Sequence, residues 1–136
     1  MRSLPFAILF ASLSLAACAS TGRMSESDKL ALYSNHAGAP VRDIRYYSPI
    51  GWDKVDDQHL LLTMRPTEVW LIRVSGPCLD WGGASPTIQV STQSGRLSAK
   101  FDRISTPQTP VSCRVEEIRP VDVAAVRASQ RAMAAK

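Results

Sequence analysis

Between Pro40 and Ile118, hydrophobic residues recur at roughly every second position, and short groups of turn-forming residues interrupt this pattern. Successive side chains of a β-strand point to opposite faces, so this period predicts strands with one buried face. The turns are short, which favours antiparallel pairing; they are Asp56-Asp57, Arg65-Pro66-Thr67 and Gln93-Ser94-Gly95. The strands that we expect are 41–47, 50–55, 59–64, 68–74, 87–91, 97–101 and 113–118.

Helical signals flank this region. Ser25 and Asp28 have capping-box spacing and Gly38 is a stop signal, which predicts a helix over about 26–36. Asp122 can cap the run 123–134, which is rich in alanine, the strongest helix former. The expected fold class is mainly β (α+β): a small antiparallel sheet or barrel of about six to seven strands with a short N-terminal helix and a C-terminal helix. One globular domain over 25–136 is expected.

The start of the chain has a different composition. Arg2 is followed by 14 uncharged residues from Leu4 to Ala17, fewer than the ~20 that a transmembrane helix needs. The run ends in Leu15-Ala16-Ala17-Cys18, which resembles the lipobox of bacterial lipoproteins, in which the thiol accepts a diacylglyceryl group. We expect 1–17 to be a signal peptide, Cys18 to be lipidated and 18–24 to be a tether. The alternative is an ordinary signal peptide followed by a chance cysteine.

Lipidation would determine the location of the domain. Two or more acyl chains anchor a protein stably. Ala19 stands where, in the lipoproteins that the motif resembles, an aspartate favours inner-membrane retention, so we expect an outer-membrane anchor with the domain facing the periplasm. Removal of Arg2 lowers the net charge from +4 to +3, too little to indicate a partner. The expected partners are the membrane, through the lipid anchor, and a protein of the envelope, whereas nucleic acid is not expected.

Two cysteines remain once Cys18 is lipidated. Cys78 and Cys113 form an even pair in an oxidising compartment, which favours a disulfide. Such a bond contributes roughly 3 to 4.5 kcal/mol by loop-closure entropy. A catalytic thiol at Cys78 is the alternative, and it would require a reduced cysteine with a histidine nearby.

An acidic cluster is the densest group of polar residues. Carboxylates with a histidine can bind a divalent metal, but the residue spacing of a calcium-binding loop is missing. A solvated hairpin turn explains the same residues. We therefore assign neither a metal nor a cofactor. The cluster consists of Asp53, Asp56, Asp57 and His59.

Other candidates for catalysis have simpler explanations. His36 lies at the expected end of the first helix, where a capping role is favoured over a general base. The segment 82–86 does not match the G-x-S-x-G pattern of a serine hydrolase. Glu68, Glu116 and Glu117 could approach other acids for glycoside chemistry, but Glu116 and Glu117 are more simply one outward and one edge-facing residue of the last strand.

The tryptophans are candidates for a contact surface, because exposed aromatic side chains bind peptides, glycans and partner proteins. Trp70 alternates with buried positions, which predicts that it is in the core. Trp81 follows Cys78 in a glycine-rich loop and is, with Trp52, the proposed contact surface; packing against the disulfide is the alternative for Trp81.

The order of motifs over 36–127 resembles a domain-of-unknown-function family of small secreted proteins and lipoproteins of Gram-negative bacteria. The resemblance implies a single domain and a structural pairing of Cys78 with Cys113, and it carries over no catalytic or binding residue. Trp70 stands where a tyrosine is expected. The matching motifs are His36-Ala37-Gly38-Ala39-Pro40-Val41, Gly51-Trp52, His59-Leu60-Leu61-Leu62, Arg65-Pro66, Trp70-Leu71, Gly76-Pro77-Cys78, Gly95-Arg96, Phe101-Asp102, Cys113-Arg114 and Ile118-Arg119-Pro120-Val121-Asp122-Val123.

These patterns predict an envelope lipoprotein that is not an enzyme. The expected role is that of a binding or scaffolding module, with the sheet face or the Trp81 loop as its contact surface. Two alternatives remain open: a lipid-tethered inhibitor of a periplasmic hydrolase, and an enzyme of unknown class.

Overall fold

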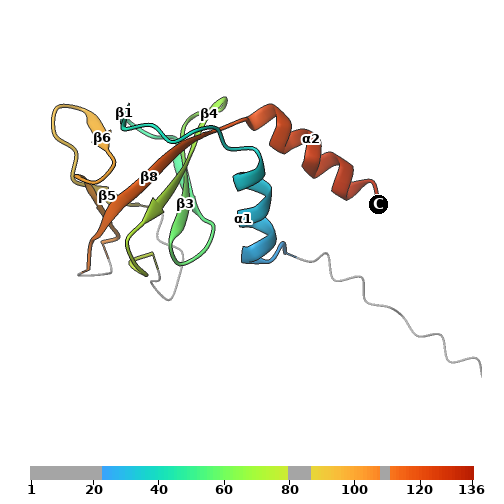
Figure 1. Cartoon of the computed structure of the whole chain (residues 1–136), viewed down its shortest axis with the longest axis horizontal. Helices are drawn as coiled ribbons and strands as arrows, with labels where there is room; N and C mark the ends of the chain where they lie inside the picture. The colour runs from blue at the N-terminus through green and yellow to red at the C-terminus, as the bar shows by residue number, and fades with distance from the viewer. Residues whose placement is uncertain (1–22, 80–86, 108–110) are drawn as a thin grey trace, which may run out of the picture.

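The computed structural model describes residues 23–79, 87–107 and 111–136, and the expected fold class is confirmed (Figure 1). A six-stranded antiparallel sheet has the order β2-β3-β4-β8-β7-β5, and β1 and β6 form a separate antiparallel pair. The elements are α1 (Glu26–Asn35), β1 (Asp43–Arg45), β2 (Gly51–Lys54), β3 (His59–Arg65), β4 (Glu68–Val74), β5 (Gln89–Val90), β6 (Arg96–Ser98), β7 (Arg103–Ser105), β8 (Cys113–Val121) and α2 (Val123–Ala134).

The strand β8 is the centre of the sheet. It pairs with β4 along one edge, and its other edge is shared by β7 and by the segment that follows α1. In that segment, the amides of Gly38 and Val41 donate to the carbonyls of Pro120 and Ile118, each at 2.8 Å. The approach is close: a Cβ at Gly38 would lie 3.0 Å from Pro120 Cγ. Glycine lets the backbone of the segment approach β8 closely.

The extent of β8 differs from the prediction that it ends at Ile118. The strand continues to Val121 through Pro120. Proline removes only one backbone donor, and its carbonyl still accepts from Gly38. The central strand β8 therefore accommodates Pro120 and is three residues longer than expected.

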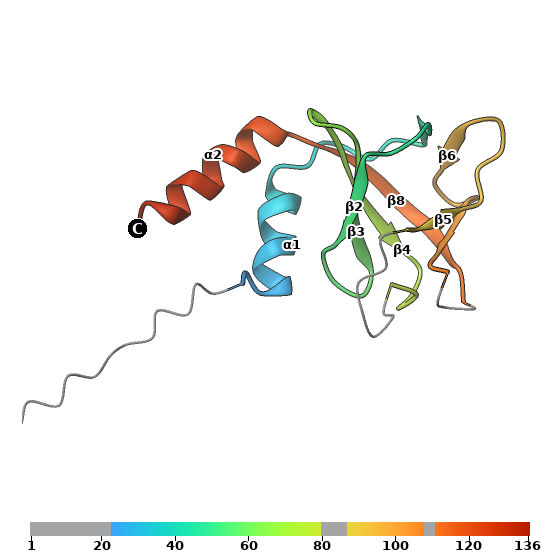
Figure 2. The same ribbon diagram turned by 180° about the vertical axis from the view of Figure 1, so that it is seen from behind.

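Hydrophobic side chains are buried on both faces of the sheet. One face holds the larger cluster, which includes Leu60, Leu62 and Ile72. On the other face, Leu61 and Leu71 pack with Leu32 of α1 and Val126 of α2. Figure 2 shows both helices together at one end of the molecule, away from β5 and β6. In the described residues, neither helix is both long and apolar enough to cross a membrane.

Both predicted helix starts are confirmed by their caps. The amide of Asp28 donates to Ser25 Oγ at 3.1 Å, and the amide of Ala125 donates to Asp122 Oδ1 at 3.0 Å. His36 occupies the C-cap position of α1, as expected, but its ring has a different role from the one predicted: Nε2 lies 2.8 Å from Ser129 Oγ and so connects α1 to α2.

The region after β5 differs most from the prediction. The turn at Ser94 and Gly95 is confirmed, with φ of 59° and 68°, which allows β6 to begin at Arg96. The expected strand 97–101 instead ends at Ser98, because Lys100 adopts a left-handed φ of 72° and turns the chain. The strand β7 was not predicted; its three residues are too few to show a period.

The predicted disulfide joins Cys78 to Cys113, with their Cα atoms 5.8 Å apart. Both cysteines are buried and belong to the larger hydrophobic cluster. The bond connects the chain that follows β4 to the first residue of β8.

Candidate ligand pocket

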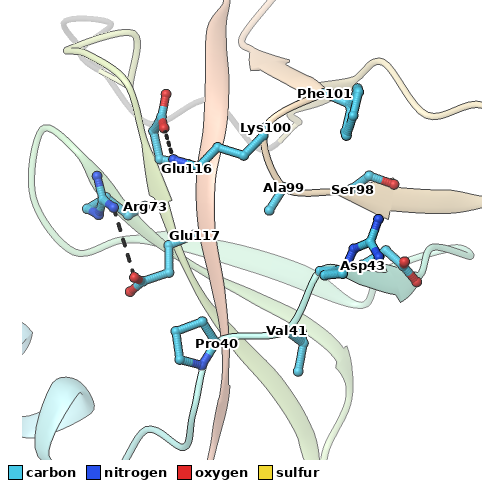
Figure 3. A pocket seen from close by; sticks show the side chains of 11 residues that line it. Pro40, Val41, Asp43, Arg73, Ser98, Ala99, Lys100, Phe101, Glu116 and Glu117 are labelled. Carbon is cyan, nitrogen blue, oxygen red and sulfur yellow. Dashed lines mark hydrogen bonds and ion pairs between the residues drawn. The ribbon is translucent and has the colours of Figure 1, made fainter.

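A pocket of about 470 Å³ lies at the middle of β8, between the end of β4 and the β1–β6 pair (Figure 3). Four separate segments form its wall: the approach to β1, the end of β4, the turn after β6 and the middle of β8. The lining residues are Pro40, Val41, Arg42, Asp43, Arg73, Ser98, Ala99, Lys100, Phe101, Glu116 and Glu117.

An irregularity in β8 brings two consecutive glutamates to this pocket. Arg73 pairs with Glu117 and Val74 pairs with Val115, so Glu116 has no opposite residue on β4. In a regular strand, neighbouring side chains point to opposite faces, whereas an extra residue interrupts that alternation. Glu116 and Glu117 therefore both line the pocket, and the prediction of one outward and one edge-facing residue is wrong.

Two of the carboxylates in the lining are held in ion pairs. Glu116 accepts from Lys100 Nζ at 2.5 Å and from Arg114 Nε at 2.7 Å. Hydrogen bonds from these two cations hold the pKa of Glu116 below its ordinary value. Asp43 forms an ion pair with Arg96.

The third carboxylate is held loosely. Glu117 Oε2 lies 3.9 Å from Arg73 Nη2, beyond hydrogen-bond distance. Figure 3 shows this pair on the side of the pocket opposite Asp43. Among the residues that the structure describes, the guanidinium groups of Arg42 and Arg73 donate no hydrogen bond, and that of Arg42 forms no ion pair.

The apolar part of the pocket includes an unusually exposed aromatic ring. Phe101 is 80% exposed, the highest value among the exposed large hydrophobic residues of the described chain. It follows the left-handed Lys100, whose amide donates to the carbonyl of Val115 at 2.7 Å. Pro40, Val41 and Ala99 contribute the other apolar lining. The pocket thus combines an apolar surface with two arginines available for hydrogen bonding.

Comparison with known proteins places the chain in a family. A family of unknown function, DUF6491, has a model that matches residues 1–136. The chain belongs to DUF6491. The resemblance to a domain-of-unknown-function family is thereby confirmed, while no curated protein and no solved structure matches the chain.

Two tryptophans of this DUF6491 chain, Trp52 and Trp70, lie outside the pocket lining. Trp52, on the edge strand β2, and Trp70, on β4, are both partly buried and pack against the larger hydrophobic cluster. Trp70 Nε1 donates to Glu68 Oε1 at 3.3 Å, and Glu68 Oε2 accepts from Tyr47 at 2.8 Å. Trp81 and Cys18 lie outside the described residues.

The acidic cluster of the DUF6491 chain lies at the β2–β3 turn: Asp53 is in β2, Asp56 and Asp57 are in the turn, and His59 begins β3. Asp56 Oδ1 accepts from the amide of Gln58 at 2.8 Å and lies 2.8 Å from His59 Nδ1, while Asp57 forms an ion pair with Lys54 at 2.8 Å. Burial alone would raise the pKa of Asp56, but hydrogen bonds from Gln58 and His59 and the charge of His59 lower it overall. Within 23–79, 87–107 and 111–136, no three His, Cys, Asp or Glu residues are grouped as metal ligands.

The pocket was not predicted from the sequence of this DUF6491 chain. Its wall depends on the register of β8 and on the turn at Lys100, and neither follows from hydrophobic period. One signal was available: Lys100 and Phe101 end an otherwise alternating segment with a cation beside an aromatic residue. That pair looked like the end of a strand, although in the structure it forms one edge of the pocket.

Proposed function

We propose that this protein is an exported lipoprotein, anchored through Cys18 to the outer membrane, which acts as a non-enzymatic binding module in the periplasm with the pocket as its binding site. The proposal of export and anchoring is supported by the uncharged leader and the lipobox-like Leu15–Cys18. The proposal of a binding role depends on the pocket, where an exposed phenyl ring shares the lining with two arginines whose guanidinium groups donate no hydrogen bond within the described chain.

The positions of the two histidines favour binding over catalysis. His36 contacts Ser129 between the helices, and His59 contacts Asp56 in the β2–β3 turn. Neither residue lines the pocket. The charged groups of the lining are arginines, a lysine and carboxylates, which suit recognition of a charged ligand.

Anchoring can be tested in cells. We expect radiolabelled palmitate to enter the wild-type chain and not Cys18→Ser, which should leave the membrane fraction. Ala19→Asp should keep the label and move the protein to the inner membrane. An unlabelled wild-type chain, or an unchanged location of Cys18→Ser, would refute the anchor.

Binding at the pocket can be tested by photo-crosslinking in intact cells. A photoreactive p-benzoylphenylalanine at Phe101 should give a defined crosslinked product. The matched control is the same probe at Ile50, which is 65% exposed and is not part of the pocket lining. Identical products from both positions, or none from position 101, would contradict the proposed site. A protease or muramidase as the product would instead support the inhibitor hypothesis.

A further inference from the structure

The charge of the pocket is not balanced once the residues behind its wall are included. The lining itself has three cations and three carboxylates. Arg96 and Arg114, which are outside the lining, bind Asp43 and Glu116. Asp102, which accepts from the amide of Ser98, adds one carboxylate behind the wall. The group as a whole therefore has five cations and four carboxylates, and the local field in the pocket favours an anion.

Two arginines supply the positive charge that such an anion would need. Arg42 is exposed on the approach to β1, and Arg73 faces the pocket from β4 at 3.9 Å from Glu117. Within the described chain neither guanidinium donates a hydrogen bond. A guanidinium presents paired N–H donors that match the two oxygens of a carboxylate or phosphate.

The aromatic residue supplies the apolar contact. Phe101 is held outward by the turn in which Lys100 has a φ of 72°, a backbone conformation that lysine rarely adopts. At 80% exposure, the ring has no packing role among the described residues that would explain its position. The volume of about 470 Å³ is within the range of small-molecule sites.

From these observations we infer that the pocket binds a small amphipathic anion: a carboxylate or phosphate that accepts hydrogen bonds from Arg42, joined to an apolar group that packs against Phe101, while Arg73 on the opposite wall adds positive charge. This inference rests on the proposed function, because it names the ligand class of the same site. It does not depend on the lipid anchor.

The test uses the full, oxidised chain and four small probes in calorimetric titration and NMR. Phenyl phosphate and phenylacetate present the two anionic groups, benzyl alcohol is a neutral counterpart, and inorganic phosphate has no apolar group. We expect at least one aromatic anion to bind more tightly than benzyl alcohol and inorganic phosphate. Its shift changes should centre on Arg42 and Phe101, and comparison of the two anions identifies the preferred group.

Variants connect the binding to the named residues. Arg42→Gln should weaken binding of the anion roughly tenfold or more, because a charge-assisted hydrogen bond is lost. Phe101→Ser should weaken the binding of the aromatic anions and leave the affinity for inorganic phosphate unchanged. The matched control is Arg45→Gln, since Arg45 is also exposed, three residues later, but is not part of the lining.

Three results would overturn the inference: no binding of either aromatic anion at millimolar concentration, equal affinity for benzyl alcohol, or an affinity that Arg42→Gln leaves unchanged. A specific crosslink from position 101 would still support the proposed binding role in each case. Loss of the crosslink together with loss of probe binding would refute both proposals.

Discussion

Removal of the Cys78–Cys113 disulfide should cost this protein a large part of its stability. The bond closes a loop with a sequence separation of 35. The loop-closure entropy for that length corresponds to about 4 kcal/mol at 25 °C. The free energy of unfolding of a domain is about 5 to 15 kcal/mol. Cys78→Ala with Cys113→Ala should therefore lower the free energy of unfolding by about 4 kcal/mol or slightly more, because both sulfur atoms also fill space in the core.

Urea unfolding followed by tryptophan fluorescence measures this loss. The wild-type chain with reductant is the matched control, since it lacks the bond but keeps both sulfur atoms in the core. The reduced chain isolates the effect of loop closure, and its difference from the double variant measures packing. A double variant within about 1 kcal/mol of the oxidised wild type would refute the entropic argument.

Three further predictions concern other regions. Gly95→Ala should lower the free energy of unfolding by about 1 kcal/mol in urea titrations, because φ at Gly95 is 68° and alanine is strained there; an unchanged midpoint would contradict this explanation. Asp56 has a lowered pKa in the folded state, so its contribution to stability is present above its ordinary pKa of 3.8 and disappears as the pH falls through the folded value. Asp56→Asn should be less stable at neutral pH and lose less stability on acidification, which unfolding at several pH values would show; parallel curves for the two proteins would count against it. A double-mutant cycle of His36→Ala and Ser129→Ala should give a coupling energy of about 1 kcal/mol between α1 and α2, and strict additivity would show that their 2.8 Å contact contributes nothing.

The regular part of the fold was predictable from the sequence. The strand β4 has the expected bounds, and β3 exceeds them by Arg65 alone, because both strands have clear apolar patterns between strong turn signals. Both helices begin at the residues that their caps indicate. Local signals determine these features, so one sequence is sufficient to locate them.

The pocket depends on relations between distant segments, and a linear pattern does not contain them. Glu116 and Glu117 share the pocket only because β8 and β4 pair with a shifted register. Phenylalanine is a residue type common in strands, but the left-handed Lys100 turns the chain just before Phe101 and leaves its side chain exposed. Both features arise when the sheet is assembled, which is why they were predicted incorrectly.

The loop between Cys78 and Cys113 contains the residues Ser98 to Phe101 and therefore one whole wall of the pocket. The opposite wall, Arg73 with Glu116 and Glu117, lies on β4 and β8 outside that loop. The disulfide therefore ties both ends of the loop that carries one wall to β4 and β8, which carry the other wall. Reduction of the bond would therefore remove a covalent constraint from the Ser98–Phe101 wall, while the sheet would still hold the opposite wall.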